Sequence, residues 1–164
     1  MNRFTFINAP DGYYFDELLA EDASLLQSMW KFGGQTEAHV EYMKLSIRSL
    51  PTACLREIGT NELASWETTH PSGYMVNHFT IERHRRKGLG AAVELKLAQN
   101  LIEADIVPHK IVLPSNEAAL RLGDGSDYFE RRGSYRWLKF LPEKEGGTRE
   151  GGRFGGDAYA FPEC

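Results

Sequence analysis

Residues 74–113 combine extended and helical patterns in an order that few folds accommodate. A β-rich segment at 74–81 leads through a basic loop into residues 89–105, where leucine and valine recur at i, i+4 spacing. The short apolar segment 110–113 follows after Pro108. Strand, helix and strand in this order predict a crossover connection, which makes the two strands parallel neighbours in one sheet.

The flanking sequence adds an antiparallel part to this sheet. Turn signals separate extended segments at 53–58, 63–69 and 74–81, and such short connections predict a meander. Further elements are expected as a strand near 12–15, helices at 20–31, 36–50 and 116–122, and late strands at 128–129 and 135–140. We therefore expect an α/β (α+β) fold, with a mixed, mostly antiparallel sheet and helices on both faces. Residues 1–141 should form a single domain, and the glycine- and charge-rich segment 142–164 a mobile tail.

Composition narrows the function classes. The net charge is −4, which argues against a general nucleic-acid or anionic-membrane binder. The longest apolar runs fall far short of the ~20 residues that a membrane span requires. Cys54 and Cys164 form no metal-ligand spacing, and the first residues resemble neither a secretory signal nor a transit peptide. We expect a cytoplasmic protein without a metal.

A local basic run contrasts with this acidic average. Within Arg83–Lys87 lie four basic side chains and a histidine, followed at once by Gly-Leu-Gly and the helix. Unpaired amides at a helix start, glycines and neighbouring cations together make a cradle for an anion, most naturally a diphosphate. A dinucleotide fingerprint would need a third glycine or alanine where Val93 stands, and the Gly-Lys-Ser/Thr of a Walker A loop is absent. A solvated charge run explains the charge but not the glycines.

Several spaced motifs resemble the GNAT N-acetyltransferase superfamily, and within it the C-terminal acyltransferase domain of the glycine N-acyltransferase-like branch. The matching motifs are Trp30-Lys31-Phe32-Gly33-Gly34, Pro51-Thr52-Ala53-Cys54, Ser65-Trp66 and the stretch from Thr80 to Gly90. Members of that branch usually carry an additional N-terminal half. They also have proline before the loop glutamate, whereas Ile81-Glu82 stands here. The branch is often mitochondrial.

The resemblance implies a co-substrate and its binding residues. Acetyl-CoA or a longer acyl-CoA would place its diphosphate on the loop and its pantetheine arm along the preceding strand, with an asparagine after the 110–113 strand contacting the arm. The implied cofactor-binding residues are Phe79, Thr80, Ile81, Arg85, Arg86, Lys87, Gly88, Leu89, Gly90, Ala91 and Asn116. His84, in the same loop, should neighbour the phosphates or be exposed.

The resemblance also implies the reaction, which is direct acyl transfer to glycine or another small amine. Two alternatives remain open: acetylation of protein or polyamine amines, and a catalytically weak acyl-CoA-binding module. A glutamate of the branch, proposed to deprotonate the amine, matches Tyr74 here. His78 is the best titrating base near neutral pH on the same strand, with Glu67 and His70 as further candidates. We therefore expect His78 and Tyr74 in the catalytic centre.

Simple alternation places His78 on the face of Tyr74, unless a bulge shifts the strand. A tyrosine that often protonates the departing thiolate in the superfamily is replaced by Gly123. Tyr128 or Ser126 could substitute for it.

Overall fold

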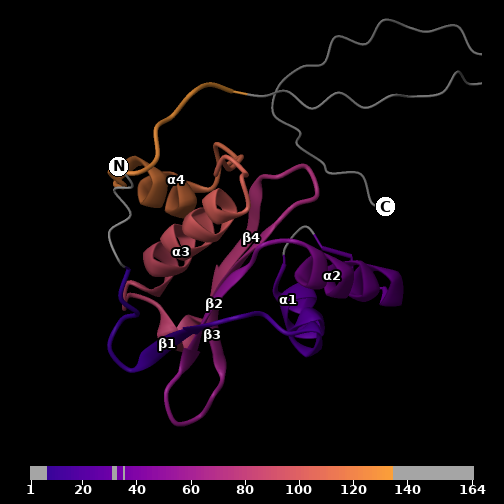
Figure 1. Ribbon diagram of the computed structural model, residues 1–164. Coiled ribbons are helices and arrows are strands. Elements are labelled where there is room, and N and C mark those ends of the chain that lie inside the picture. The colour runs from indigo at the N-terminus through magenta and orange to yellow at the C-terminus, as the bar shows by residue number, and fades with distance from the viewer. Residues whose placement is uncertain (1–6, 31–32, 35, 135–164) are drawn as a thin grey trace, which may run out of the picture.

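The computed structural model describes residues 7–30, 33–34 and 36–134 (Figure 1). The strands are β1 (Tyr13–Asp16), β2 (Ala53–Glu57), β3 (Leu63–Thr69) and β4 (Met75–Thr80). The helices are α1 (Ala23–Met29), α2 (Glu37–Ser49), α3 (Leu89–Glu103) and α4 (Glu117–Asp124), with short 3₁₀ turns η1 (Ala20–Asp22) and η2 (Glu82–His84). None of the helices in these ranges is long and apolar enough to cross a membrane.

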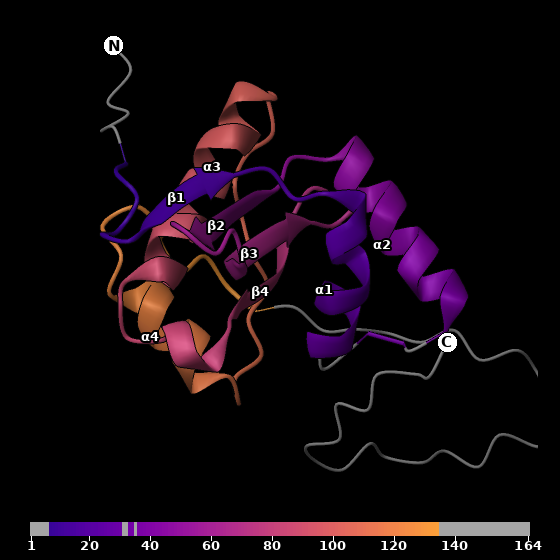
Figure 2. The same ribbon diagram turned by 90° about the horizontal axis from the view of Figure 1, so that it is seen from below.

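The strands form one antiparallel sheet in the order β1-β2-β3-β4. Figure 2 shows α3 and α4 on one side of the sheet, with α1 and α2 on the other. The expected fold class, with helices on both faces, is confirmed.

Each face has its own apolar cluster. The predicted stripe of α3 is fully buried at Val93, Leu97 and Leu101, and packs on Leu55 of β2 and Met75 of β4. Burial of each such side chain contributes about 1.5–3 kcal/mol, so packing fixes α3 firmly on the sheet. On the opposite face, buried side chains of α1 and α2 surround Trp66 of β3. All seven residues of β3 are buried, as its central place in the sheet requires.

An irregularity interrupts the pairing of β3 with β4. The register shifts between Trp66 and Thr68, and Asn77 opposite has a φ of 54°. The bulged residue changes the alternation of β4, so Val76 and His78 face opposite sides of the sheet. His78 points toward α3, whereas Val76 lines a hollow beside α2.

Two expected strands differ from the structure. The segment 110–113 contributes only one parallel bridge, between Met75 and Lys110. Residues 128–129 form no strand, and Tyr128 is 63% exposed, which is more than a strand side chain on the apolar face of a sheet would be. The expected strand at 135–140 and the tail at 142–164 lie outside the described residues.

Candidate functional site

The basic loop connects the end of β4 to the start of α3. Arg85, Arg86, Lys87 and Gly88 are exposed, and the helix begins at Leu89. Gly88 has a φ of 78°, a conformation that side chains disfavour, and an ideal Cβ there would meet nothing within 4 Å. The amides of Leu89, Gly90 and Ala91 belong to the first turn, where no intrahelical carbonyl is available to them. This end of α3 therefore combines free donors with open space.

Two of the loop cations, Arg85 and Lys87, contact aromatic residues and a backbone carbonyl. Arg85 Nε donates to the carbonyl oxygen of Thr80 at 3.1 Å, and its guanidinium lies 5.6 Å from the ring centre of Phe79. Lys87 Nζ donates to the Tyr13 hydroxyl at 2.9 Å. These contacts hold two positive charges beside the helix start.

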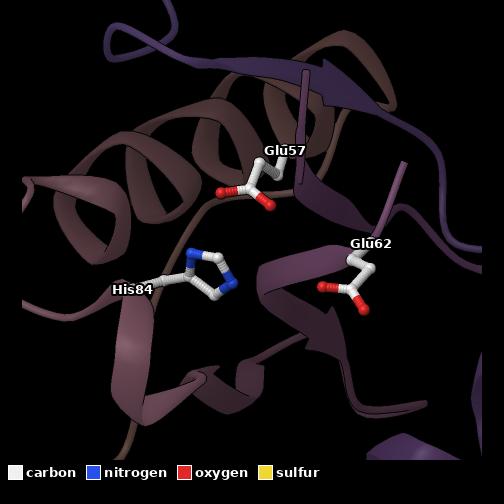
Figure 3. A group of neighbouring side chains, drawn as sticks. All are labelled: Glu57, Glu62 and His84. Atoms are coloured by element: carbon white, nitrogen blue, oxygen red, sulfur yellow. The ribbon is translucent and has the colours of Figure 1, made fainter. Parts of the chain in front are cut away.

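His84 does not belong to this exposed surface. It is 2% exposed, and its two ring nitrogens contact Tyr13 Oη at 2.8 Å and Arg83 Nε at 3.0 Å. Figure 3 shows Glu57, Glu62 and His84 pointing toward one another beside the loop between β2 and β3. An imidazole nitrogen and one carboxylate oxygen of each glutamate all lie within 4.8 Å of one another. Arg83 pairs with Glu62 and so supplies a cation to this group. The expectation of an exposed or phosphate-facing His84 is wrong, because the Tyr13 contact draws the ring inward.

On its outer edge, β4 pairs with the segment after α3 only at Met75 within residues 36–134, and the two then separate. We call this point of separation the fork. Met75 donates to the carbonyl of His109 at 2.8 Å and bridges Lys110, but in the described part of the chain β4 pairs with no strand on this side beyond that point. The Ile81 amide donates inward to Ala64 at 2.9 Å. Because amides alternate along a strand, that of Thr80 points to the open edge. Of the three edge residues implied by the resemblance, Ile81 thus has its amide engaged with β3.

A pocket of about 200 Å³ lies between α3 and α4. Its lining residues are Ala91, Glu94, Leu95, Leu122, Gly125, Ser126, Asp127 and Tyr128. Asn116 caps α4, where its side-chain oxygen accepts from the Ala119 amide at 3.2 Å. Ala91 belongs to the first turn of α3, so the pocket adjoins the basic loop.

A buried polar cluster joins β3, β4, α3 and the bridge residue. Glu67 and Glu94 are each 1% exposed, His78 Nδ1 lies 3.9 Å from Glu67 Oε1, and Lys110 Nζ donates to Glu94 Oε1. Burial raises the pKa of Glu67 to about 8, against the opposing effect of Lys110. Burial, and then Lys110, lower the pKa of His78 to about 4. His78 is therefore neutral at pH 7, and Glu67 is the member that exchanges a proton near that pH.

The two expected catalytic residues lie apart. Tyr74 stacks on His70 with ring centres 4.3 Å apart, and burial raises the pKa of its hydroxyl. His70 lines a shallow hollow between α2 and the ends of β3 and β4, together with Trp30, Tyr42, Met43, Ser46, Thr68, Thr69, Pro71 and Val76. The bulge at Asn77 is the reason that His78 faces α3 instead.

Glu94 and Lys110 were not predicted as site residues from the sequence. A signal existed for each: Glu94 follows Val93 inside the apolar pattern of α3, and Lys110 precedes an apolar triplet. Charged residues at positions expected to be buried mark a paired or functional cluster.

Comparison with known proteins agrees with this architecture. The family described as FR47-like protein matches residues 53–136. Human glycine N-acyltransferase-like protein 1 is 28% identical over 126 residues, which is 76% of this chain and 41% of the relative. Human glycine N-acyltransferase-like protein 1B is 25% identical over 119 residues, or 72% of this chain and 38% of the relative. The chain thus spans about two fifths of the length of these curated relatives.

Solved structures establish the fold. An aminoglycoside 6'-N-acetyltransferase from Acinetobacter baumannii superposes with a TM-score of 0.61 at 11% identity, covering 80% of this chain and 100% of the other. Glucosamine-6-phosphate N-acetyltransferase from Arabidopsis thaliana gives 0.54 at 15% identity, covering 79% and 99%. The family match spans more than half of the chain, and the fold agrees with it. The chain belongs to the FR47-like family of the GNAT superfamily.

Proposed function

We propose that this protein is an acyl-CoA-dependent N-acyltransferase that transfers an acetyl or larger acyl group to the amino group of a small amine. The observation that carries the proposal is the exposed start of α3, where Gly88 leaves the first-turn amides open beside Arg85, Arg86 and Lys87. A diphosphate matches both the geometry and the charge of this loop. The glycine N-acyltransferase-like relatives support the same co-substrate and favour glycine among small amines.

The acyl-CoA arm would extend from the loop along the open edge of β4. The Thr80 amide offers it a strand-like hydrogen bond, and the pocket between α3 and α4 can receive its remaining length. The thioester then lies near the fork at Met75, where the amine attacks it directly in a ternary complex. Such a transfer needs a proton acceptor for the ammonium and a proton donor for the thiolate.

His78 is the proposed proton acceptor, and Glu67 supports it. Neutral His78 can receive the proton, and the ionised fraction of Glu67, whose pKa burial raises to about 8, can take it in turn. Tyr74, whose ring stacks on His70 of the hollow near α2, would contact the acceptor rather than serve as the base.

One observation favours a different acceptor class. Among the described residues, the hollow beside α2 is lined by aromatic, aliphatic and hydroxyl side chains, with His70 as its only basic group. A glycine carboxylate would need a cation or several donors there, whereas a polyamine or peptide amine would not. The second candidate is therefore an acetyltransferase for amines without a carboxylate.

The test measures release of free CoA thiol with acetyl-CoA and a panel containing glycine, spermidine and a lysine peptide, beside calorimetry with CoA. Glycine-dependent release supports the first candidate, and release only with spermidine or peptide supports the second. Binding of CoA without release from any acceptor would leave a binding module and reject both enzyme proposals.

A further inference from the structure

Lys110 occupies the fork where β4 and the following segment separate. Its backbone bridges Met75, and its side chain, 14% exposed, reaches Glu94 of α3. Its Nζ also lies 4.9 Å from the ring centre of Phe129. The ammonium therefore stands between the open edge of β4 and the pocket that Glu94 lines.

The charged groups around Lys110 come from three elements. Glu94 of α3 accepts its hydrogen bond, Glu67 of β3 raises its pKa, and His78 of β4 is a further titratable neighbour. Burial acts more strongly than the charge of Glu67 and lowers the pKa of Lys110 below its usual 10.5. The hydrogen bond to Glu94 favours the ammonium form, while burial makes this ammonium a better proton donor than a solvated lysine.

Gly123 leaves open space beside this ammonium. An ideal Cβ on Gly123 would lie 3.6 Å from Lys110 Cε and 3.7 Å from Nζ. A larger side chain at this position of α4 would therefore compete with the lysine for the same volume. Because position 123 has no side chain, the Lys110 ammonium occupies the side of the pocket that faces the fork.

On the basis of the proposed function, we propose that Lys110 is a catalytic residue whose ammonium protonates the departing thiolate of CoA. Residues 76–80 of β4 span roughly 13 Å at the usual rise of a strand. The pantetheine arm, extended along this edge from the loop, can cover that span and bring its sulfur to the fork. Lys110, the cation of the buried cluster, bridges Met75 at this point, and its side chain is 14% exposed.

The reaction balances with this assignment. The acceptor ammonium first loses one proton toward His78 and then to solvent. The amine nitrogen forms a bond to the thioester carbon and, to become the neutral amide, gives up a second proton to solvent. As the carbon–sulfur bond breaks, its electron pair goes to sulfur, which takes a proton from Lys110 Nζ. The neutral lysine then regains a proton from solvent through the pocket between α3 and α4.

The main test compares wild type with Lys110→Met and with the double variant Lys110→Met/Glu94→Gln. The double variant removes both partners of the ion pair, so it avoids leaving Glu94 buried and unpaired. We expect kcat to fall roughly 100-fold in both, the usual contribution of a proton donor, with the Kd for CoA changed less than about threefold. Lys96→Met, a charge removal elsewhere on α3, should keep wild-type turnover.

Two further readouts separate proton donation from structural support. Wild-type kcat should decrease as pH rises through the lowered pKa of Lys110, and this alkaline decrease should vanish in the double variant. Lys110→Arg keeps the charge but does not release a proton, so its kcat should stay low. Adding Gly123→Tyr to Lys110→Met should restore part of kcat, because a phenol then points into the vacated volume.

The outcomes distinguish this proposal from the function on which it depends. A wild-type protein that neither binds CoA nor releases thiol would refute the proposed function itself. Two results would refute only the role of Lys110 as proton donor and leave the proposed function standing. These are wild-type turnover in the folded double variant and wild-type turnover in Lys110→Arg.

Discussion

Replacement of Gly88 by leucine tests the loop assignment most directly. An ideal Cβ at Gly88 meets no atom within 4 Å, so the expected cost to stability is conformational and not steric. A left-handed non-glycine residue costs about 1–2 kcal/mol. In a domain of this size that corresponds to a decrease in Tm of roughly 2–8 °C. The protein should therefore stay folded.

Binding of CoA should change far more. The leucine side chain would cover the amides at the start of α3, and each lost bond to a charged phosphate costs about 1.5–3 kcal/mol. Loss of two such bonds raises the Kd more than about 100-fold. Gly59→Leu is the matched control, because Gly59 also has a positive φ, of 94°, and open space around its Cβ. It should lose similar stability without losing CoA.

Calorimetric titration with CoA and thermal unfolding, done on both variants, measure the two effects separately. If folded Gly88→Leu binds CoA as tightly as Gly59→Leu, the loop does not hold the diphosphate. At Gly90 the outcome differs, since an added Cβ would lie 3.3 Å from His78 Nε2. Substitution there should disturb the polar cluster as well as binding.

Three other variants test the remaining assignments. His78→Ala should lower kcat roughly 100-fold with little change in CoA affinity, and an unchanged pH–rate profile would exclude His78 as the base. Glu67 has a folded-state pKa of about 8, above its ordinary 4.5, so the free energy of unfolding should decrease as pH rises between these values. Urea unfolding of Glu67→Gln should show a smaller decrease, and equal slopes would contradict this. Arg56→Met removes a 7% exposed side chain bound to Asp16 and Asp22, each at 2.7 Å, and should cost about 3–5 kcal/mol in urea unfolding; a loss below 1 kcal/mol would contradict the pairing.

Sequence reasoning located most of the fold because local signals agreed with the packing. The stripe of α3 and the turns around β3 were both predicted, and both follow from periodicity and glycine or proline positions. The strand predicted at 110–113 is reduced to one bridge in the structure, since an apolar run does not specify how far it pairs with a neighbouring strand. In the site, the loop could be predicted because its cations, its glycines and the start of the helix are consecutive in the sequence.

The polar cluster could not be predicted in the same way. Glu67, Glu94 and Lys110 come from separate elements, and only tertiary packing brings their side chains together. The single bulge at Asn77 decides which face His78 occupies, and one residue in a strand leaves little trace in an alternating pattern. The inward position of His84 likewise depends on Tyr13, 71 positions earlier.

Over the residues that the structure describes, most of the outer edge of β4 pairs with no strand, and this has a consequence for the handling of the protein. A strand with unpaired backbone groups can be joined by a strand from another molecule, which is a common beginning of aggregation. An acyl-CoA arm lying on that edge would occupy the same groups, and so would oppose self-association as well as raise Tm by mass action. Preparations kept with CoA should therefore remain dispersed at concentrations where the unliganded protein forms larger species.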